Sequence, residues 1–500
     1  MKLLRIALAW LVSTSLAVAQ SDSLPLKGSV TIDAELTAIL ASISRTPFWL
    51  QANQYGTIPV NNPAGLARIG VSGQWRLSDS RPQRYVSYGV EAVGAVASPS
   101  SSVVLPQAYV SLDLGHFSLW GGRKKEIIGL GDSTLSSGFY SWSGNALPIT
   151  KIQIGTNGFT PLGFTRGILA VHAFFAHGWF ANSDSMQQSY LHQKAIYVRI
   201  GRPNWRIRLT GGILHNAQWG GHSPYLSPIV ARDGQLPHSL KDYWYVVTTQ
   251  QPDELESTNH TAFDGINRFG NHLGSIDLGA ELSLGQWQAI GYYQHPFEDK
   301  SGVAFANFPD GLYGFRLKRP LTRQTGFQLQ HILFEYLNTM NQSGPMSSTG
   351  QHYDGRDDYF NNYQYLDGWV QKQHVIGTPF LTRRQDLRPE LQNAKPNLSI
   401  YSQWAIANNR VQMYYMGLGG AFASGIRIQA QLSYSHNYGT FRTPFDQSVS
   451  QFSGVCWLTW PLRWLGGSEL KTAIALDQGK LYENSLGGRI SLRKVWKSGK

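Results

Sequence analysis

An alternation of apolar and polar residues with a period of two recurs along most of this chain. In GIRIQAQLSYS, residues 425–435, every second residue from Ile426 to Leu432 is apolar, and the residues between them are Arg or Gln. A period of two is the repeat of a β-strand, because successive side chains point to opposite faces of the sheet. The segments IYVRI (196–200), RIRLT (206–210) and YGFRLK (313–318) alternate in the same way. A soluble β-sandwich shows this pattern too, so alternation alone leaves two all-β fold classes open.

The connections between the strands separate these classes. Eighteen candidate strands can be placed, at 29–42, 66–77, 84–97, 103–113, 116–124, 150–156, 165–180, 189–200, 204–216, 272–284, 286–296, 311–318, 326–338, 410–419, 426–436, 452–460, 468–476 and 486–496. If the first strand runs outward, eight short connections share the periplasmic side: 78–83, 114–115, 157–164, 201–203, 285, 319–325, 420–425 and 461–467. The long connections all lie outside, at 43–65, 125–149, 217–271, 339–409 and 437–451.

An even strand number with short periplasmic turns and long extracellular loops is typical of a bacterial outer-membrane barrel. We therefore predict an all-β fold, a transmembrane antiparallel β-barrel of about eighteen strands. The segment SIYSQWAIA (399–407) is placed inside a long loop, and a strand there would break the even count.

The first 19 residues, MKLLRIALAWLVSTSLAVA, have the features of a secretory signal peptide. A basic start (Lys2, Arg5) precedes a short apolar body, and Ala17 and Ala19 form a cleavage site of small residues. A membrane anchor is the alternative, but the apolar body falls short of the ~20 residues of a spanning helix. No linker or change in composition divides residues 20–500, so we expect one outer-membrane β-barrel domain.

Composition agrees with an exported membrane barrel. Charged residues make up 15% of the chain, below the ~25% of an ordinary soluble domain, while aromatic residues reach 12%. The single cysteine, Cys456, excludes an intramolecular disulfide and a cysteine-based metal site. The formal charge is +12, and contact with outer-membrane lipid phosphates is one explanation of this basic charge; we expect no nucleic-acid partner.

A Gly-Asp-Ser triplet in GLGDSTLSSGFYSWSGNALP (129–148) resembles the nucleophile motif of some esterases. A catalytic Ser133 would need a base within hydrogen-bond reach and a group that orients this base. The Asp-x-x-His spacing of Asp113 and His116 precedes Ser133 and lies at a predicted turn. Asn271 and His272 are neighbours on a predicted strand and would face opposite sides. We predict that the protein is not an enzyme.

No zinc-binding or phosphate-binding motif occurs in the sequence, and we expect no metal and no cofactor. Scattered histidines are expected to fill the lumen or the rim of the barrel; they are His172, His177, His192 and His215.

Several blocks of the sequence together resemble the capsule-assembly Wzi family, in the form found in Bacteroidetes. The blocks are PFWLQANQYGTIP (47–59), GLGDSTLSSGFYSWSGNALPITKIQIG (129–155), FAHGWFAN (175–182), YLHQKAIYVRIG (190–201), GNHLGSIDL (270–278), DDYFNNYQYLDGW (357–369) with IGTPF (376–380), and SYSHNYGTFRTPF (433–445). They span essentially the whole mature chain. The resemblance implies an outer-membrane barrel of eighteen strands that acts as a surface lectin and helps capsular polysaccharide to attach to the cell surface.

The sequence departs from the enterobacterial members of that family at its N-terminus. Those members carry an N-terminal helical bundle that plugs the periplasmic end. Here SVTIDAELTAILAS (29–42) alternates like a strand, and no helix pair is evident before it. The plug and the identity of the glycan are therefore open.

Several of the family-like blocks lie in predicted extracellular loops and supply aromatic rings and polar groups suited to sugar binding. Aromatic faces can stack on pyranose rings, and Asn, Gln or Asp can bind hydroxyl groups. The candidates are Trp49, Asn53, Gln54, Tyr55, Asp132, Ser133, Tyr140, Trp142, Asn145, Tyr359, Asn361, Asn362, Tyr365 and Trp369. The alternative is that these blocks fold inward and form a lid that closes the barrel, with Gly and Asn in tight turns.

Basic residues fall on the polar faces of several predicted strands. A lumen rich in arginine would favour anionic groups, such as the uronates of an acidic capsule, through bidentate contacts. Barrel interiors also pair Arg with Asp and Glu for structural reasons, and this alternative is favoured. The residues are Arg199, Arg206, Arg208, Arg316, Lys318, Arg427, Arg489 and Arg493.

Two functions stay open at this point. One is a non-catalytic barrel, expected to be a monomer, that binds capsular or other surface polysaccharide. The other is an outer-membrane porin or substrate channel, which predicts a lumen free of loops and conductance of ions.

Overall fold

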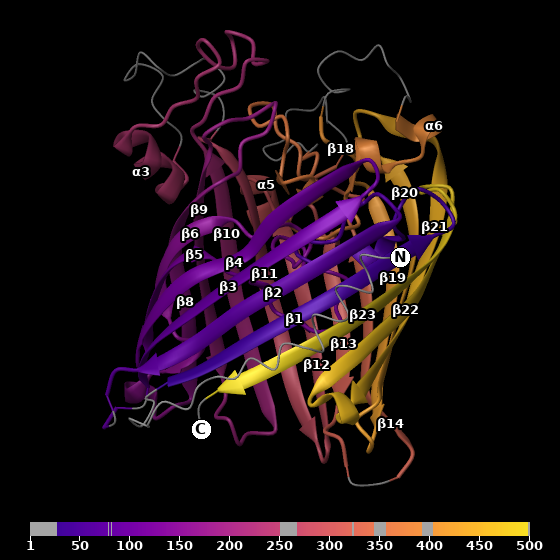
Figure 1. The fold of residues 1–500 in the computed structure, drawn as a ribbon. Coiled ribbons are helices and arrows are strands. Elements are labelled where there is room, and N and C mark those ends of the chain that lie inside the picture. Colours follow the sequence, from indigo (N-terminus) through magenta and orange to yellow (C-terminus); the bar gives the residue numbers. More distant parts are fainter. Residues whose placement is uncertain are drawn as a thin grey trace.

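The β-strands of this protein close into a barrel that spans the membrane (Figure 1). The computed structural model describes residues 28–498, except for 79, 82, 251–267, 323–324, 345–356 and 393–403. The predicted signal peptide lies outside the described residues. The first strand, β1 (Gly28–Ala41), pairs antiparallel with β2 (Ala64–Arg76) on one side and with the last strand, β23 (Ser485–Ser498), on the other. This pairing closes the sheet, so no free edge is left.

The closed barrel has eighteen strands, as the connection lengths predict. Each strand pairs antiparallel with its neighbours in the chain. The other strands are β3 (Arg84–Ala97), β4 (Ser100–Leu114), β5 (Phe117–Arg123), β6 (Thr150–Thr156), β8 (Leu169–Trp179), β9 (Tyr190–Ile200), β10 (Ile207–Trp219), β11 (Asn271–Leu284), β12 (Trp287–Phe297), β13 (Gly311–Lys318), β14 (Phe327–Asn338), β19 (Val411–Phe422), β20 (Arg427–Gly439), β21 (Pro444–Leu462) and β22 (Ser468–Gly479). The two-residue β7 (Thr160–Pro161) pairs with β8 next to β6.

The predicted alternation gives the barrel an apolar outer face and a polar lumen. On β1, Ile32 and Leu40 are exposed on the outside, whereas Asp33 and Glu35 take part in ion pairs inside. The segment 29–42 is therefore a barrel strand, as its alternation predicts. The outward apolar side chains are exposed because this face of the barrel contacts the lipid of the membrane.

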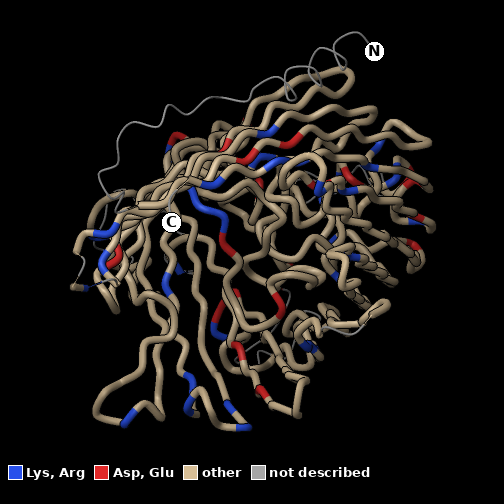
Figure 2. The backbone as a smooth tube through the Cα atoms, turned by 60° about the horizontal axis from the view of Figure 1, so that its bottom comes forward, with Lys and Arg blue, Asp and Glu red and all other residues tan. Residues whose placement is uncertain are grey.

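The two ends of the barrel differ in their connections. At one end the turns are short, and Gly115 and Gly285 adopt positive φ angles of 75° and 61° in the tight turns after β4 and β11. These are angles that a glycine adopts at little cost. Figure 2, turned to bring this end forward, shows lysines and arginines at several of the short turns.

At the other end lie the long connections and most of the small elements. The elements there are α2 (Phe48–Gln51), α3 (Leu240–Thr248), α5 (Lys300–Val303), α6 (Pro389–Gln392), the pair β15 (Val370–Gln371) and β16 (His374–Val375), and the pair β17 (Thr382–Arg383) and β18 (Ile406–Asn408). Of the segment 399–407, residues 399–403 lie outside the described residues, and β18 pairs within the loop rather than in the barrel wall. No helix in the described ranges is long and apolar enough to cross a bilayer.

Candidate functional site

Three long loops turn into the barrel and meet there. We call loop A residues 42–63, loop B residues 124–149, and loop C the described residues 357–392 and 404–410; together they form the lid. Buried apolar side chains from all three loops and from the inner wall belong to one continuous cluster. The lid is thus a packed core inside the long-loop end of the barrel.

Loops A and B are joined by backbone and amide hydrogen bonds. The Tyr55 amide donates to the Gly144 carbonyl at 2.6 Å, and the Gly56 amide donates to the Asn145 carbonyl at 3.0 Å. The side chain of Asn53 donates to the Ser137 carbonyl at 3.0 Å. Because these bonds satisfy groups that would otherwise lose water on burial, they fix the register of the two loops.

Loops B and C are joined in the same way. The Ser143 hydroxyl donates to the Gly377 carbonyl at 2.6 Å, and the Asn145 side chain donates to the Val375 carbonyl at 2.9 Å. A Cβ atom at Gly377 would lie 1.9 Å from the Tyr140 carbonyl oxygen. The backbones therefore approach each other as closely as only a glycine allows.

Polar side chains of the inner wall hold loop B in place. The Glu335 carboxylate accepts from the Ser137 amide at 2.6 Å and from the Ser136 hydroxyl at 2.8 Å. The Gln294 side chain accepts from the Tyr140 amide at 2.8 Å and donates to the Leu130 carbonyl at 2.9 Å. These wall residues bind the loop backbone directly, so they specify an inward path for the loop.

Six of the seven predicted aromatic candidates are buried in this lid, and Tyr55 is partly exposed. Their rings pack against one another and against the wall: Tyr140 contacts Tyr359 and Phe360, with ring centroids 5.9 and 5.5 Å apart. The exposed fractions are 2% for Trp49, 0% for Tyr140, 6% for Trp142, 0% for Tyr359, 2% for Tyr365 and 0% for Trp369. Because the rings are buried, a sugar ring cannot stack on them in this arrangement. The alternative prediction, in which these blocks fold inward as a lid, describes this arrangement.

The predicted polar candidates divide into two groups. Asp132, Asn145 and Asn361 are buried and bond the lid; the Asn361 side chain, for example, donates to the Ile406 carbonyl at 2.9 Å. Asn53, Gln54, Tyr55 and Asn362 are partly exposed. Of these, Asn53 and Tyr55 bond loop B, and the Asn362 side chain accepts from the Gln364 amide at 2.8 Å. A direct role of any of them in sugar binding stays a prediction.

The Gly-Asp-Ser triplet forms a turn in loop B. The Asp132 carboxylate accepts from the amides of Thr134 and Leu135, at 2.9 and 2.7 Å, and lies 2.9 Å from Nε2 of His331. Burial raises the pKa of Asp132, but hydrogen bonds from His331 and Thr134 outweigh burial and hold the pKa below its usual range. Within the described part of the chain, no histidine bonds the exposed Ser133 hydroxyl.

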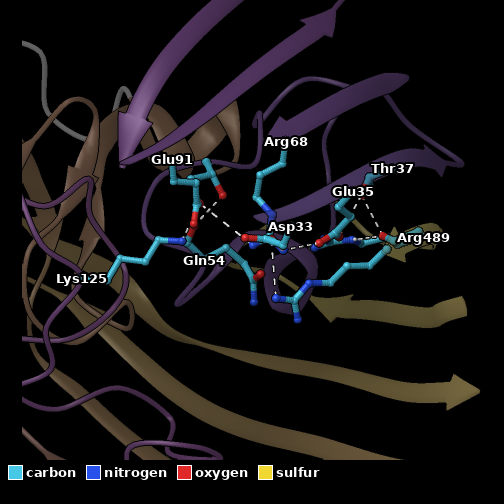
Figure 3. Close-up of polar contacts among 11 residues, drawn as sticks. Asp33, Glu35, Thr37, Gln54, Arg68, Glu91, Lys125 and Arg489 are labelled. Carbon is cyan, nitrogen blue, oxygen red and sulfur yellow. Dashed lines mark hydrogen bonds and ion pairs between the residues drawn. The ribbon is translucent and has the colours of Figure 1, made fainter. Parts of the chain in front are cut away.

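Six of the eight predicted basic residues of the lumen lie within ion-pair distance of carboxylates, and among the described residues Arg206 and Lys318 have no such contact. Arg208 contacts Glu281, and Arg199 approaches the same carboxylate at 3.5 Å. The corresponding contacts are Arg316 to Asp132 at 3.3 Å, Arg427 to Glu469 at 2.9 Å, Arg489 to Glu35 at 3.1 Å, and Arg493 to Asp33 at 3.5 Å. Figure 3 shows how Arg68 and Arg489 join the acids of β1 and how Lys125 reaches Glu91. These six lumen arginines thus have the structural pairing that the alternative predicts.

A small cavity that the sequence gave no reason to expect lies at the rim, between loops A and C. Its volume is about 50 Å³, and its lining includes Arg45, His374 and Arg383. Both arginines contact Asp386, at 3.1 and 2.8 Å. Burial raises the pKa of Asp386, but the two guanidinium charges outweigh burial and lower it, so this carboxyl stays ionised. The run TRRQDLRPE (382–390) was the one local signal for a basic rim.

A larger cavity of about 490 Å³ lies below segment 124–130 of loop B. Its lining includes Lys124, Trp120 and Tyr197, and it reaches residues 155–159 at the short-turn end. This part of the lumen therefore lies on the opposite side of the lid from the long-loop surface.

Comparisons with known proteins agree on the architecture. No family model and no curated protein sequence matches the chain. The solved structure of Wzi from Escherichia coli, described as an outer membrane protein involved in group 1 capsule assembly and as a carbohydrate-binding β-barrel, matches with a TM-score of 0.57 at 12% identity, over 92% of this chain and 84% of that one. This chain has the fold of an outer-membrane β-barrel.

Two Pseudomonas aeruginosa proteins are also similar. OccK5 (OpdH) covers 95% of this chain and 100% of its own, with 7% identity and a TM-score of 0.48. OpdQ covers 94% and 99%, with 7% identity and a TM-score of 0.47.

Proposed function

We propose that this protein is a non-catalytic, Wzi-like outer-membrane barrel that binds surface polysaccharide and assists its attachment to the cell. The observation that carries the proposal is the lid, in which three loops bond one another and the wall across the lumen. A diffusion channel needs an open lumen, so the lid favours binding over passage. The likeness of the fold to a carbohydrate-binding barrel supports the same choice.

The rim between loops A and C is the part of the long-loop surface that we assign to polysaccharide contact. Arg45 uses only Nη2 toward Asp386, so its other N–H groups can bind a carboxylate or hydroxyl oxygen. A water needs roughly 10–15 Å³ of such space, so a cavity of about 50 Å³ fits a substituent of a sugar rather than a whole ring. The lysine nearest in sequence to this lining, Lys372, is exposed and adds a second cation at the rim.

The test uses a deletion strain complemented with wild type or with Arg45→Gln/Lys372→Gln. We expect the double variant to bind purified surface polysaccharide about tenfold more weakly, because charge-assisted hydrogen bonds are lost. Cell-bound polysaccharide should fall and shed polysaccharide should rise, with heat-modifiable gel migration unchanged.

Arg427→Gln is the matched control, since Arg427 is more than half exposed at the short-turn end and pairs with Glu469. If the double variant binds polysaccharide as tightly as wild type, the assignment of the binding site to the rim is wrong. Steady ion conductance of the wild-type barrel in planar bilayers, with no binding of polysaccharide, would replace the proposed function by the channel.

A further inference from the structure

The outer face of four neighbouring strands carries histidines near the long-loop end. His177 on β8 follows the outward Phe175, and His215 on β10 follows the outward Ile213; the remaining two are His192 on β9 and His272 on β11. His177, His192 and His215 therefore lie on the outer face near the rim rather than in the lumen, whereas His172 lines the lumen cavity. Polar groups on a lipid-facing wall need cover or a ligand.

Helix α3 covers part of this histidine row from the outside. Tyr243 stacks on Trp219 with ring centroids 4.9 Å apart, and its hydroxyl lies 3.3 Å from Nδ1 of His192. Val246 is fully buried against the wall, and Lys194 donates to the Val247 carbonyl. The helix thus sits on the outer wall beside the barrel, as Figure 1 shows.

The opposite face of α3 is apolar and exposed. Leu240 and Trp244 lie one helical turn apart and are 90% and 61% exposed. Tryptophan is enriched where a membrane meets water, and apolar side chains of interfacial helices insert at the boundary of the acyl chains. On this face α3 is therefore suited to contact with lipid.

A crevice of about 390 Å³ lies on the same outer wall, between the end of α3 and α5. Its lining is mainly apolar and includes Ile196, Ile213 and Phe297. Two cations, Lys194 and Arg268, also line it. On the outer face of β9, the apolar Ile196 is followed by the charged Lys194 toward the long-loop end. The cations therefore lie at the boundary between the hydrocarbon layer and the lipid headgroups.

The acids that line the crevice are engaged elsewhere. Glu298 accepts from the Phe360 amide at 2.8 Å, and Asp299 accepts from the Ser301 amide at 2.7 Å. Among the described residues, neither Lys194 nor Arg268 lies within ion-pair distance of a carboxylate. Within the described part of the chain, the crevice therefore joins an apolar surface to two cations that have no carboxylate partner.

We propose that this crevice binds a phosphorylated glycolipid of the outer leaflet, of the lipid A type. An acyl chain lies along Ile196, Ile213 and Phe297, and a phosphate group contacts Lys194 and Arg268. The long loops mark this end as extracellular, and the outer leaflet there is the source of phosphorylated glycolipid. The proposal is independent of polysaccharide binding at the rim, which lies between loops A and C.

The experiment titrates the delipidated, purified barrel with bisphosphorylated hexa-acyl lipid A and counts bound lipids by native mass spectrometry. Its dephosphorylated form and phosphatidylglycerol are the comparison lipids. We expect wild type to bind bisphosphorylated lipid A at least about tenfold more tightly than either comparison lipid, and Lys194→Gln/Arg268→Gln to lose about tenfold in affinity. Arg206→Gln/Lys318→Gln, which removes the same two charge types at the short-turn end, should bind like wild type.

A second variant guards against misfolding of the first. Val303→Trp fills the crevice from α5, where Val303 is about half exposed, and leaves the wall strands untouched. It should also lose binding of bisphosphorylated lipid A. The proposal is overturned if wild type shows no preference for the phosphorylated lipid, or if both variants bind it as wild type does.

Discussion

Strands β9 to β11 carry polar side chains on both faces near the long-loop end. The inward and the outward side chains differ in their hydrogen-bond partners. Inside, Gln193 donates to the Asn216 side chain at 2.7 Å, and Asn216 donates in turn to the Leu273 carbonyl at 3.0 Å. Asp277 accepts from the Leu130 amide of loop B at 3.1 Å and from the Tyr197 hydroxyl at 3.0 Å. Outside, Nε2 of His215 lies 2.9 Å from Nδ1 of His272, and His192 packs against Tyr243. Among the described residues, Lys194 bonds only the Val247 carbonyl.

This difference distinguishes polar side chains that hold the lid in place from polar side chains that can bind a ligand. The inward groups Gln193, Asn216 and Asp277 bond protein partners, and buried polar groups with partners specify how a loop packs. The outward Lys194 keeps donors beyond its one contact, next to an apolar crevice. Inside the barrel, therefore, mutation should test the folding of the lid, and outside it should test binding of lipid.

The largest effect is expected for the lid tryptophans. Trp142→Ala/Trp369→Ala removes two buried indoles, and such truncations typically cost about 3–5 kcal/mol each. The lid should lose its packing while the barrel still inserts, so retained polysaccharide should fall and ion conductance should appear. Bilayer recordings, and the ratio of cell-bound to shed polysaccharide, measure the two results.

Trp205→Ala and Trp287→Ala are the controls for this prediction, because both residues lie next to short turns, away from the lid. The prediction is wrong if the double variant retains polysaccharide and conducts no ions. The packing of the lid would then not depend on these two indoles.

A smaller effect is expected within the Gly-Asp-Ser turn. Asp132→Ala leaves the amides of Thr134 and Leu135 and the cation of Arg316 without their acceptor, which should destabilise loop B by about 1–3 kcal/mol. Ser133→Ala changes an exposed hydroxyl and should stay within about 0.5 kcal/mol of wild type. Hydrogen exchange of residues 130–147 measures both. An esterase assay in which wild type is active and Ser133→Ala is inactive would restore the nucleophile.

The barrel itself could be predicted from sequence because its signals are local. Alternation sets the two faces of a strand such as β20, and the lengths of the connections set the strand number. The outward histidines were also readable: Phe175 and His177, or Ile213 and His215, share the parity of the lipid-facing side.

The inward path of the loops had no comparable local signal. Loop B is held by Gln294 and Glu335, which lie 154 and 198 residues from the groups of the loop that they bind. Three of the family-like blocks, 47–59, 129–155 and 357–369, supply the lid, where residues suited to stacking on sugars are equally suited to packing. Only the pairing with the wall distinguishes these roles.

The last effect concerns pH and two buried acids, Asp357 of the lid and Asp310, which accepts a hydrogen bond from the lid residue Tyr359. Burial, and then the charge of Asp299, raises the pKa of Asp357 to about 7, and burial raises that of Asp310 to about 6. An unfolded aspartate loses its proton near pH 4. Between about pH 4 and pH 7 the folded lid therefore binds more protons than the unfolded lid does, so its stability should fall as the pH rises through this window. The slope is at most about 1.4 kcal/mol per pH unit for each carboxyl.

Asp357→Asn should flatten this dependence, because the amide is neutral at every pH and can still meet the Ser343 hydroxyl, which donates to Asp357 at 2.7 Å. Hydrogen exchange of residues 357–369, corrected for intrinsic rates, measures the change. Asp233→Asn removes an exposed acid and should leave the wild-type profile intact. A wild-type lid that becomes more stable from pH 4 to pH 7 would show that these carboxyls are ionised and partnered in the folded state. In that case the carboxylates of Asp357 and Asp310 would be stabilised by interactions beyond the hydrogen bonds described here.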